Sequence, residues 1–207
     1  MEALFKQYVG EKPKNPPVEE VKTEIEKELQ AAFKKKETEA LELYEKGNAA
    51  YDNNQFKEAI SFLTAAVEIV ETASFHFARG NSYLVTSDFK LALQDYEVAL
   101  GHYKSSENRQ GEESILGKLG ITYSSLGQYD KAIDYYTQAL AIAREIGDRN
   151  GEGSHLGNLG LAYRSLGQYD KAIEYKTLAL AIFEKIKSPN AERARQKISE
   201  LKAQKDL

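Results

Sequence analysis

The 207-residue sequence contains no cysteine. This absence excludes disulfide bonds, thiolate nucleophiles and metal sites built from cysteine ligands. Proline is also scarce, with 4 residues in the whole chain, and Pro13, Pro16 and Pro17 all lie near its start. Because proline disrupts the interior of a helix, nearly everything after residue 17 is free to be helical.

Long apolar runs and an excess of positive charge are missing as well. No stretch approaches the ~18–20 apolar residues of a membrane-spanning helix, and the first residues lack the apolar region of a signal peptide. The chain carries 28 Lys+Arg against 32 Asp+Glu, a net charge of -4. Without a basic face, binding to nucleic acid and insertion into a membrane are not expected. The sequence predicts a cytoplasmic protein, or one in an equivalent reducing compartment.

Motifs of catalysis and of metal binding are absent too. There is no P-loop, H-E-x-x-H, G-x-S-x-G or EF-hand pattern. The segment 151–157, GEGSHLG, resembles a dinucleotide-binding loop, but its spacing is wrong and no strand precedes it, so we interpret it as a loop between repeats. His76, His102 and His155 have no ligand cluster nearby in the sequence and are interpreted as packing or surface residues. We predict a protein without enzymatic activity, cofactor or metal.

What the chain does contain is an internal repeat. The segment SILGKLGITYSSLGQYDKAIDYYTQALAI, from Ser114, returns 40 residues later as SHLGNLGLAYRSLGQYDKAIEYKTLALAI, from Ser154. Two weaker copies precede this pair. One glycine in each copy marks the spacing: Gly47, Gly80, Gly120 and Gly160. Within a copy, apolar residues recur at helical spacing, stop at a turn such as SLGQYD and resume, which predicts a helical hairpin.

Small residues hold the pattern together. Gly120, Ala132 and Ala139 lie where paired helices must approach closely. The order L-G, Tyr, G-x-Y, Ala, aromatic, Ala resembles the tetratricopeptide-repeat family and is matched nearly throughout by the third and fourth copies. The first two copies depart from it, with Lys46 and Arg79 in place of leucine. Other departures are His76 in place of an aromatic residue or leucine, and Asn54 and Ser87 in place of the turn glycine.

This resemblance implies an all-α fold, an α-solenoid of helix-turn-helix hairpins, and a role in binding other proteins. In repeat length and loop type, the 40-residue copies are also similar to the long repeats of kinesin light chains and of spindle-orientation adaptors. We therefore expect longer second helices and longer connecting loops in the later copies.

The predicted organisation follows from the repeat frame. It comprises a flexible segment and proline-rich tether over 1–17, an N-terminal helix over 18–39, four repeats over 40–72, 73–112, 113–152 and 153–190, and a C-terminal capping helix over 191–207. Residues 1–17 are either a frayed terminus or a peptide that docks in a groove. Residues 18–46 contain no glycine or proline and predict one long helix, or two with a joint near Lys36, acting as a cap or a short coiled-coil seam.

The capping helix is predicted from one apolar face. Ala191, Ala194, Ile198 and Leu201 share that face and cover the end of the stack. Lys176 replaces the aromatic residue that the preceding copy has as Tyr136, which predicts looser, wetter packing against the cap.

In the resembling family, the first helices of the hairpins line a concave groove. The family positions imply a partner-binding groove made by Tyr44, Asn48, Tyr51, Phe77, Asn81, Leu84, Lys118, Ile121, Asn158, Leu161 and Arg164. Such a mixture of apolar anchors and amides suits an amphipathic helix or an extended peptide. The aromatic members are equally compatible with packing between helices. Gly117 and Gly157 are costly inside a helix, which indicates close approach of a ligand or a neighbouring backbone.

One family function can be tested against the residues. Co-chaperones of the family hold a C-terminal carboxylate with Lys, Asn and Arg side chains from the first three copies. Of those positions only Asn48 agrees here, with Lys118 as a partial substitute, so this role is not expected. The sequence predicts an adaptor that binds a peptide or helix of a partner protein. The alternatives are a self-associating assembly protein, present as a homo-oligomer, and a peptide-sensing regulatory subunit.

Overall fold

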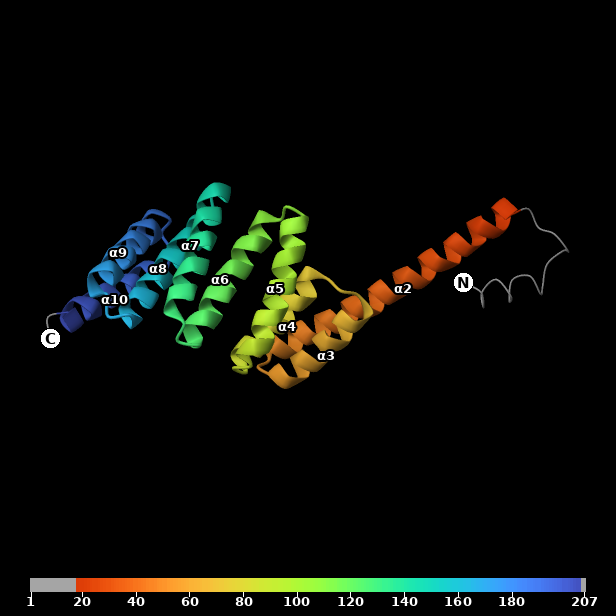
Figure 1. Ribbon diagram of the computed structural model, residues 1–207, viewed down its shortest axis with the longest axis horizontal. Coiled ribbons are helices and arrows are strands. Elements are labelled where there is room, and N and C mark those ends of the chain that lie inside the picture. Colours follow the sequence, from red (N-terminus) through yellow and green to blue (C-terminus); the bar gives the residue numbers. More distant parts are fainter. Residues whose placement is uncertain (1–17, 206–207) are drawn as a thin grey trace.

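A computed structural model describes residues 18–205, which form nine helices and no strand (Figure 1). The helices are α2 (Val18–Asp52), α3 (Phe56–Ile69), α4 (Ala73–Val85), α5 (Phe89–Ser105), α6 (Arg109–Ser125), α7 (Tyr129–Ile146), α8 (Arg149–Ser165), α9 (Tyr169–Lys185) and α10 (Asn190–Lys205). Four hairpins pair α2 with α3, α4 with α5, α6 with α7 and α8 with α9, and α10 packs on α9. The predicted all-α solenoid is confirmed.

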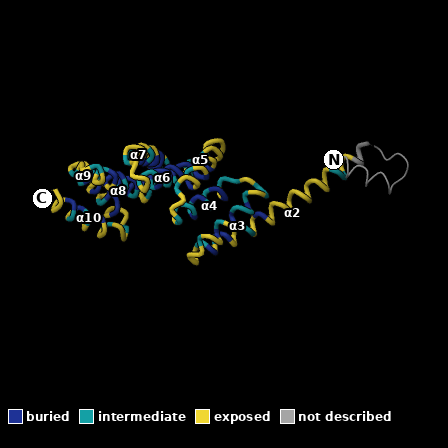
Figure 2. Tube along the Cα trace, turned by 60° about the horizontal axis from the view of Figure 1, so that its bottom comes forward, coloured by how far each residue is buried: buried dark blue, intermediate teal, exposed yellow. Residues whose placement is uncertain are grey.

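The sequence predicted either one long helix or two helices with a joint near Lys36. The structure has one helix, because α2 continues through that position. Its first half extends away from the stack, and the side chains of residues 26–39 are exposed (Figures 1 and 2). Among residues 22–52 of this helix, Ala40 is the first that is buried. The described part of this extension therefore does not cap the stack. The proposed docking peptide, residues 1–17, lies outside the described residues.

The turn inside each hairpin places one residue in the left-handed conformation. Gly127 (φ 72°) and Gly167 (φ 73°) occupy it in the later copies, and Asn54 (φ 61°) and Ser87 (φ 65°) occupy it in the earlier ones. The turn geometry is thus the same even where the sequence departs from glycine. Asparagine tolerates this region, whereas serine adopts it at a cost of about 1 kcal/mol.

The extra residues of the 40-residue copies lengthen the helices, as expected for the second helices, but they do not lengthen the loops, and that part of our expectation is wrong. Only Gly147 and Asp148 separate α7 from α8, and the segment 151–157 lies inside α8, not in a loop. The side chain of Asp148 accepts a hydrogen bond from the Gly151 amide at 2.9 Å and starts the helix there. Boundaries drawn at 113 and 153 therefore fall about one turn inside α6 and α8.

Small residues allow each hairpin to close, as predicted. Ala132 and Ala139 are fully buried. A Cβ atom added to Gly120 would lie 2.5 Å from Cε1 of Tyr136, so the tyrosine ring rests directly on the glycine backbone. In the last hairpin the aliphatic stem of Lys176 takes the place of that ring, with its Cγ 2.9 Å from a Cβ added to Gly160.

Two departures in the second copy, His76 and Arg79, form a buried polar cluster with Asp95. Arg79 donates two hydrogen bonds to Asp95, from Nε at 2.8 Å and from Nη2 at 2.7 Å, and His76 Nδ1 lies 2.7 Å from the same carboxylate. Burial raises the pKa of Asp95, but the hydrogen bonds from Arg79 and His76 outweigh it and hold that pKa below its usual value. The cluster explains why a histidine and an arginine replace apolar residues here.

His155 is buried too, but among the described residues its Nδ1 has no hydrogen-bond partner. Its Nε2 contacts the carboxylate of Glu113 on α6. Both histidines therefore hold neighbouring helices together, as the interpretation from sequence has it. Within residues 18–205, no His, Asp and Glu side chains gather as ligands of a metal ion, and no helix is both long enough and apolar enough to cross a membrane.

Candidate functional site

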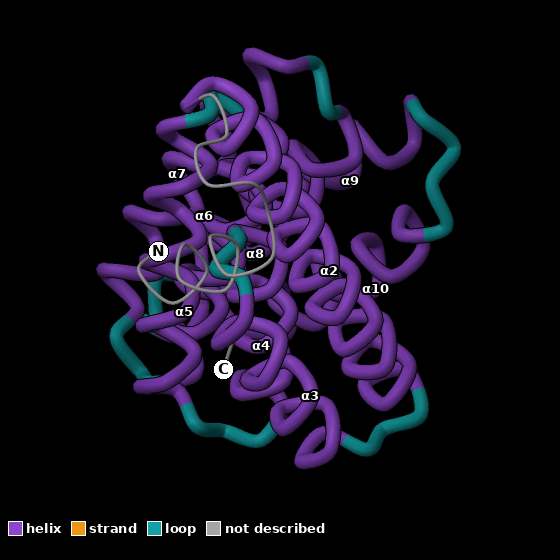
Figure 3. Tube along the Cα trace, turned by 90° about the vertical axis from the view of Figure 1, so that its right-hand side faces the viewer, coloured by secondary structure: helices purple, strands orange, loops and turns teal. Residues whose placement is uncertain are grey.

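The first helices of the hairpins form one continuous layer. Helices α2, α4, α6 and α8 contact one another in succession, whereas among the described residues the second helices make no contacts of comparable extent. The first helices therefore lie closer to one another than the second helices do, and successive hairpins make most of their contacts between a second helix and the next first helix. Seen from the α2 end, successive hairpins are rotated relative to one another (Figure 3). We call the face formed by α2, α4, α6 and α8 the first-helix layer.

The three aromatic residues of the predicted groove pack between helices. Tyr44 stacks on Phe75 with ring centroids 4.9 Å apart. Tyr51 meets the ring of Phe56 edge-on, with ring centroids 5.4 Å apart. The ring centroid of Phe77 lies 6.2 Å from that of Tyr96. All three are half-buried. They contribute to the core, which is the alternative that the sequence left open, and keep only part of their surface for a ligand.

The polar candidates in the middle of the layer are partly occupied. The side chain of Asn81 accepts a hydrogen bond from the Tyr96 hydroxyl at 3.0 Å. Lys118 is half-buried, and burial lowers its pKa. At Gly117 an added Cβ would lie 2.9 Å from Cε1 of His155, so a neighbouring side chain fills that space and leaves none for a ligand. The remaining candidates of this region are also half-buried: Asn48, Leu84 and Ile121.

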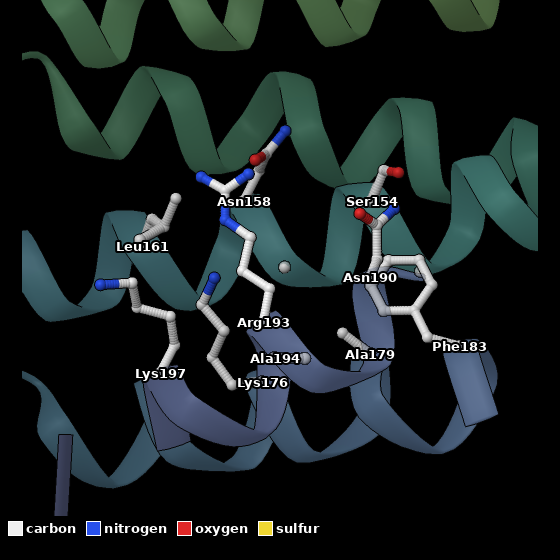
Figure 4. A pocket seen from close by; sticks show the side chains of 12 residues that line it. Ser154, Asn158, Leu161, Lys176, Ala179, Phe183, Asn190, Arg193, Ala194 and Lys197 are labelled. Atoms are coloured by element: carbon white, nitrogen blue, oxygen red, sulfur yellow. The ribbon is translucent and has the colours of Figure 1, made fainter. Parts of the chain in front are cut away.

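The last candidates come together at a pocket of about 220 Å³ between α8, α9 and α10 (Figure 4). Asn158 and Leu161 line it from α8, and Arg164 lines a smaller neighbouring hollow that Leu161 shares. Buried apolar surface comes from Ala179 and Phe183. The other lining residues are Gly153, Ser154, Gly157, Lys176, Asn190, Arg193, Ala194 and Lys197.

Lysine and arginine side chains give this pocket its charge. Lys176 is only 8% exposed. Burial, and then the nearby charges of Arg193, Lys197 and Arg164, lower the pKa of Lys176 to about 8. No described residue that lines the pocket carries a carboxylate. Outside the lining, Glu200 accepts a hydrogen bond from Lys197 at 2.6 Å.

The sequence did not reveal these cations as site residues. Lys176 was noticed at the position of an aromatic residue, but it indicated only loose packing against the cap. The structure shows that this packing leaves a pocket with a buried ammonium group. Arg193 and Lys197 lie on α10, beside the apolar face of Ala194 and Ile198 that covers the stack. The sequence did contain a sign of these site residues, because Arg193 and Lys197 stand directly before Ala194 and Ile198 of the apolar face.

Two family models, both described as tetratricopeptide repeat, match the chain over residues 28–108 and 111–185. Together they cover most of the sequence. A search of curated proteins found no relative that matches.

Solved structures share the fold. Aspartyl phosphate phosphatase F from Bacillus subtilis superposes with a TM-score of 0.75 at 22% identity, covering 96% of this chain and 55% of that one. The Rap conjugation gene regulator of plasmid pLS20, in complex with the Phr* peptide, gives 0.65 at 21% identity, with coverages of 77% and 46%. TPR-like repeats named for a kinesin light chain of Podosopora anserina give 0.64 at 18%, with coverages of 79% and 91%. The chain spans about half the length of the first two.

Proposed function

Because the chain belongs to the tetratricopeptide-repeat family, we propose that it is a non-enzymatic adaptor that binds a peptide or helix of a partner protein. The ligand lies along the first-helix layer and ends in the pocket between α8, α9 and α10. One observation carries the proposal: this pocket combines an exposed apolar side chain, Leu161, with the amides of Asn158 and Asn190.

The chemistry of the pocket suits a peptide. A side-chain amide both donates and accepts hydrogen bonds, so it can pair with the N–H and C=O groups of a peptide backbone. Apolar surface beside the amide binds a side chain of the same peptide. Peptide-binding proteins commonly combine these two kinds of contact. A structural neighbour with the same fold is a complex with the Phr* peptide, which supports a peptide as ligand.

The proposal does not include catalysis. One structural neighbour is named a phosphatase, but a likeness at 22% identity over about half of that protein supports only a shared fold. The residues that line the pocket include no carboxylate or histidine to act as a base or nucleophile within the described chain.

The test compares two leucines of similar exposure on different faces. Leu161 is 41% exposed and lines the pocket, whereas Leu178 on α9 is 44% exposed and lies outside it. Peptides selected from a displayed random library against the full chain serve as ligands, and fluorescence anisotropy measures their affinity. We expect Leu161→Ala to weaken binding about fivefold to tenfold.

The matched variant Leu178→Ala should bind as the wild type does. Equal losses in both variants, or selected peptides that bind without regard to Leu161, would mean that the ligand lies elsewhere. If the library yields no binder, the proposed peptide-binding function is wrong.

Self-association is a second candidate, favoured by one observation. The extended half of α2 exposes Leu29 and Phe33, the latter by 58%. Large apolar side chains in such positions often mark a contact with another protein. A second copy of the chain, paired along α2, would cover them.

A further inference from the structure

The last hairpin differs from the one before it at several buried positions, and at one of them Lys176 stands where the third copy has Tyr136. In the third copy, the ring of Tyr136 fills the space above Gly120. In the fourth copy, the narrower stem of Lys176 lies above Gly160, and its Nζ reaches to 3.9 Å from a Cβ added to Gly157 on α8. Lys176 therefore passes over Gly160 and places its positive charge in the pocket between α8, α9 and α10.

Cations from three helices lie in this pocket or in the hollow next to it. Lys176 belongs to α9, Arg193 and Lys197 to α10, and Arg164 to α8. In Figure 4 the side chains of Lys176 and Arg193 run side by side toward Asn158. We call these four residues the cation cluster.

The cluster has too few counter-charges. Glu200 is paired with Lys197, and the hydrogen bond from Lys197 followed by the charges of Lys197 and Arg164 lowers its pKa. Among the described residues, Lys176, Arg164 and Arg193 form no ion pair. Charges of one sign repel strongly where water is partly excluded. A bound anion would relieve that repulsion.

The pocket lies at the start of α10 as well. Asn190, the first residue of that helix, lines it together with Arg193. The first N–H groups of a helix carry partial positive charge, which adds to the field of the cluster. The apolar floor of Ala179 and Phe183 shows that the site does not suit a fully hydrated ion alone.

We propose that the cation cluster binds a side-chain carboxylate of the partner peptide, an Asp or Glu that stands beside an apolar residue. The carboxylate meets Lys176 and the guanidinium of Arg193, and the apolar neighbour rests on the floor of the pocket. This inference rests on the proposed peptide-binding function and names the chemistry of the ligand. It differs from the family's carboxylate clamp, which uses first helices of the first three copies, because Lys176 comes from a second helix and Arg193 from the cap.

The experiment begins with the same random peptide library, selected against the full wild-type chain. Peptides that survive should be enriched in Asp and Glu next to an apolar residue. The variant Lys176→Tyr restores the residue of the preceding copy, so it fits above the glycine while removing the charge. We expect it to bind the selected peptides at least about tenfold more weakly.

Two further measurements sharpen the result. Replacing the acidic residue of a selected peptide by its amide should weaken wild-type binding at least as much, and should weaken Lys176→Tyr binding less, because only Arg193 is then left to meet the carboxylate. Arg193→Gln, at an exposed position of α10, provides a second pocket variant in case Lys176→Tyr does not fold. Lys202→Gln, on the same helix but outside the pocket, removes an equal charge and should leave affinity unchanged.

The outcomes are distinguishable. Selected peptides that are neutral or basic, or that bind Lys176→Tyr and Arg193→Gln as well as the wild type, would overturn this inference and leave the peptide-binding function standing. A library without any binder contradicts both. If inorganic phosphate shifts the amide resonances of Ser154 and Asn158 while acidic peptides do not bind, the pocket is a small-anion site and the proposal is wrong.

Discussion

Replacing Lys176 by methionine should stabilise the protein at neutral pH. Methionine keeps the unbranched stem that lies on Gly160 and removes the charge. Burial, followed by the charges of Arg193, Lys197 and Arg164, lowers the pKa of Lys176 from 10.5 to about 8. One pKa unit corresponds to about 1.4 kcal/mol. After a reduction for water at the open side of the pocket, the protonated lysine costs the folded state about 1–3 kcal/mol.

The pH dependence of this gain has a definite sign. The folded-state pKa of Lys176 lies below the unfolded value of 10.5. Below about pH 8 both states hold the proton, and the folded state bears the full cost. Between about 8 and 10.5 the unfolded state binds more protons, so the stability of the wild type rises with pH relative to the variant. The advantage of Lys176→Met should therefore shrink over that range.

Urea denaturation followed by circular dichroism measures the effect at about pH 7 and about pH 10 for both proteins. Lys202→Met, at an exposed position of α10, controls for the loss of a charge and should show no such difference. A variant less stable than the wild type at neutral pH, or an advantage that is equal at both pH values, would refute the reasoning.

Two other predictions follow from single positions. Gly120→Ala should lower the free energy of unfolding, measured by urea denaturation, by about 1–3 kcal/mol, because the new Cβ overpacks the ring of Tyr136. At Gly101 an added Cβ meets nothing within 4 Å. Gly101→Ala should therefore raise the free energy of unfolding by up to about 1 kcal/mol. Equal effects at both glycines would contradict the close approach. If α2 mediates self-association, light scattering over a concentration series should show a mass above that of one chain, and Phe33→Ser should abolish it. A single-chain mass at every concentration excludes pairing through α2.

The fold could be predicted because its determinants are local and repeated. A small residue such as Gly120 recurs at the same place in each copy, and each time a larger side chain from the second helix lies on it. This relation needs no long-range information, since hairpin partners are close in the sequence. Repeats then stack on their neighbours by the same contacts, so one hairpin predicts the next.

The connections between repeats were predicted less well for a physical reason. Family matching sets the repeat frame on the buried residues, but a helix begins where its first N–H groups find an acceptor. Asn108 and Asp148 supply that acceptor, each at 2.9 Å from the amide three residues later. Because both stand before the residues that define the family pattern, the additional turn of helix was assigned to a loop.

The candidate site shows a different limit. Tyr44 and Phe77 were carried over from the family as groove residues, yet their packing partners fix how much of each is free, and those partners are known only from the fold. Lys176 was visible as a departure from the repeat, but its meaning depends on Arg193, which a separate helix brings beside it. Residues that match between the hairpins maintain the stack. A charged residue that replaces a buried aromatic one weakens the stack, so its function is to be sought in the groups that its charge faces.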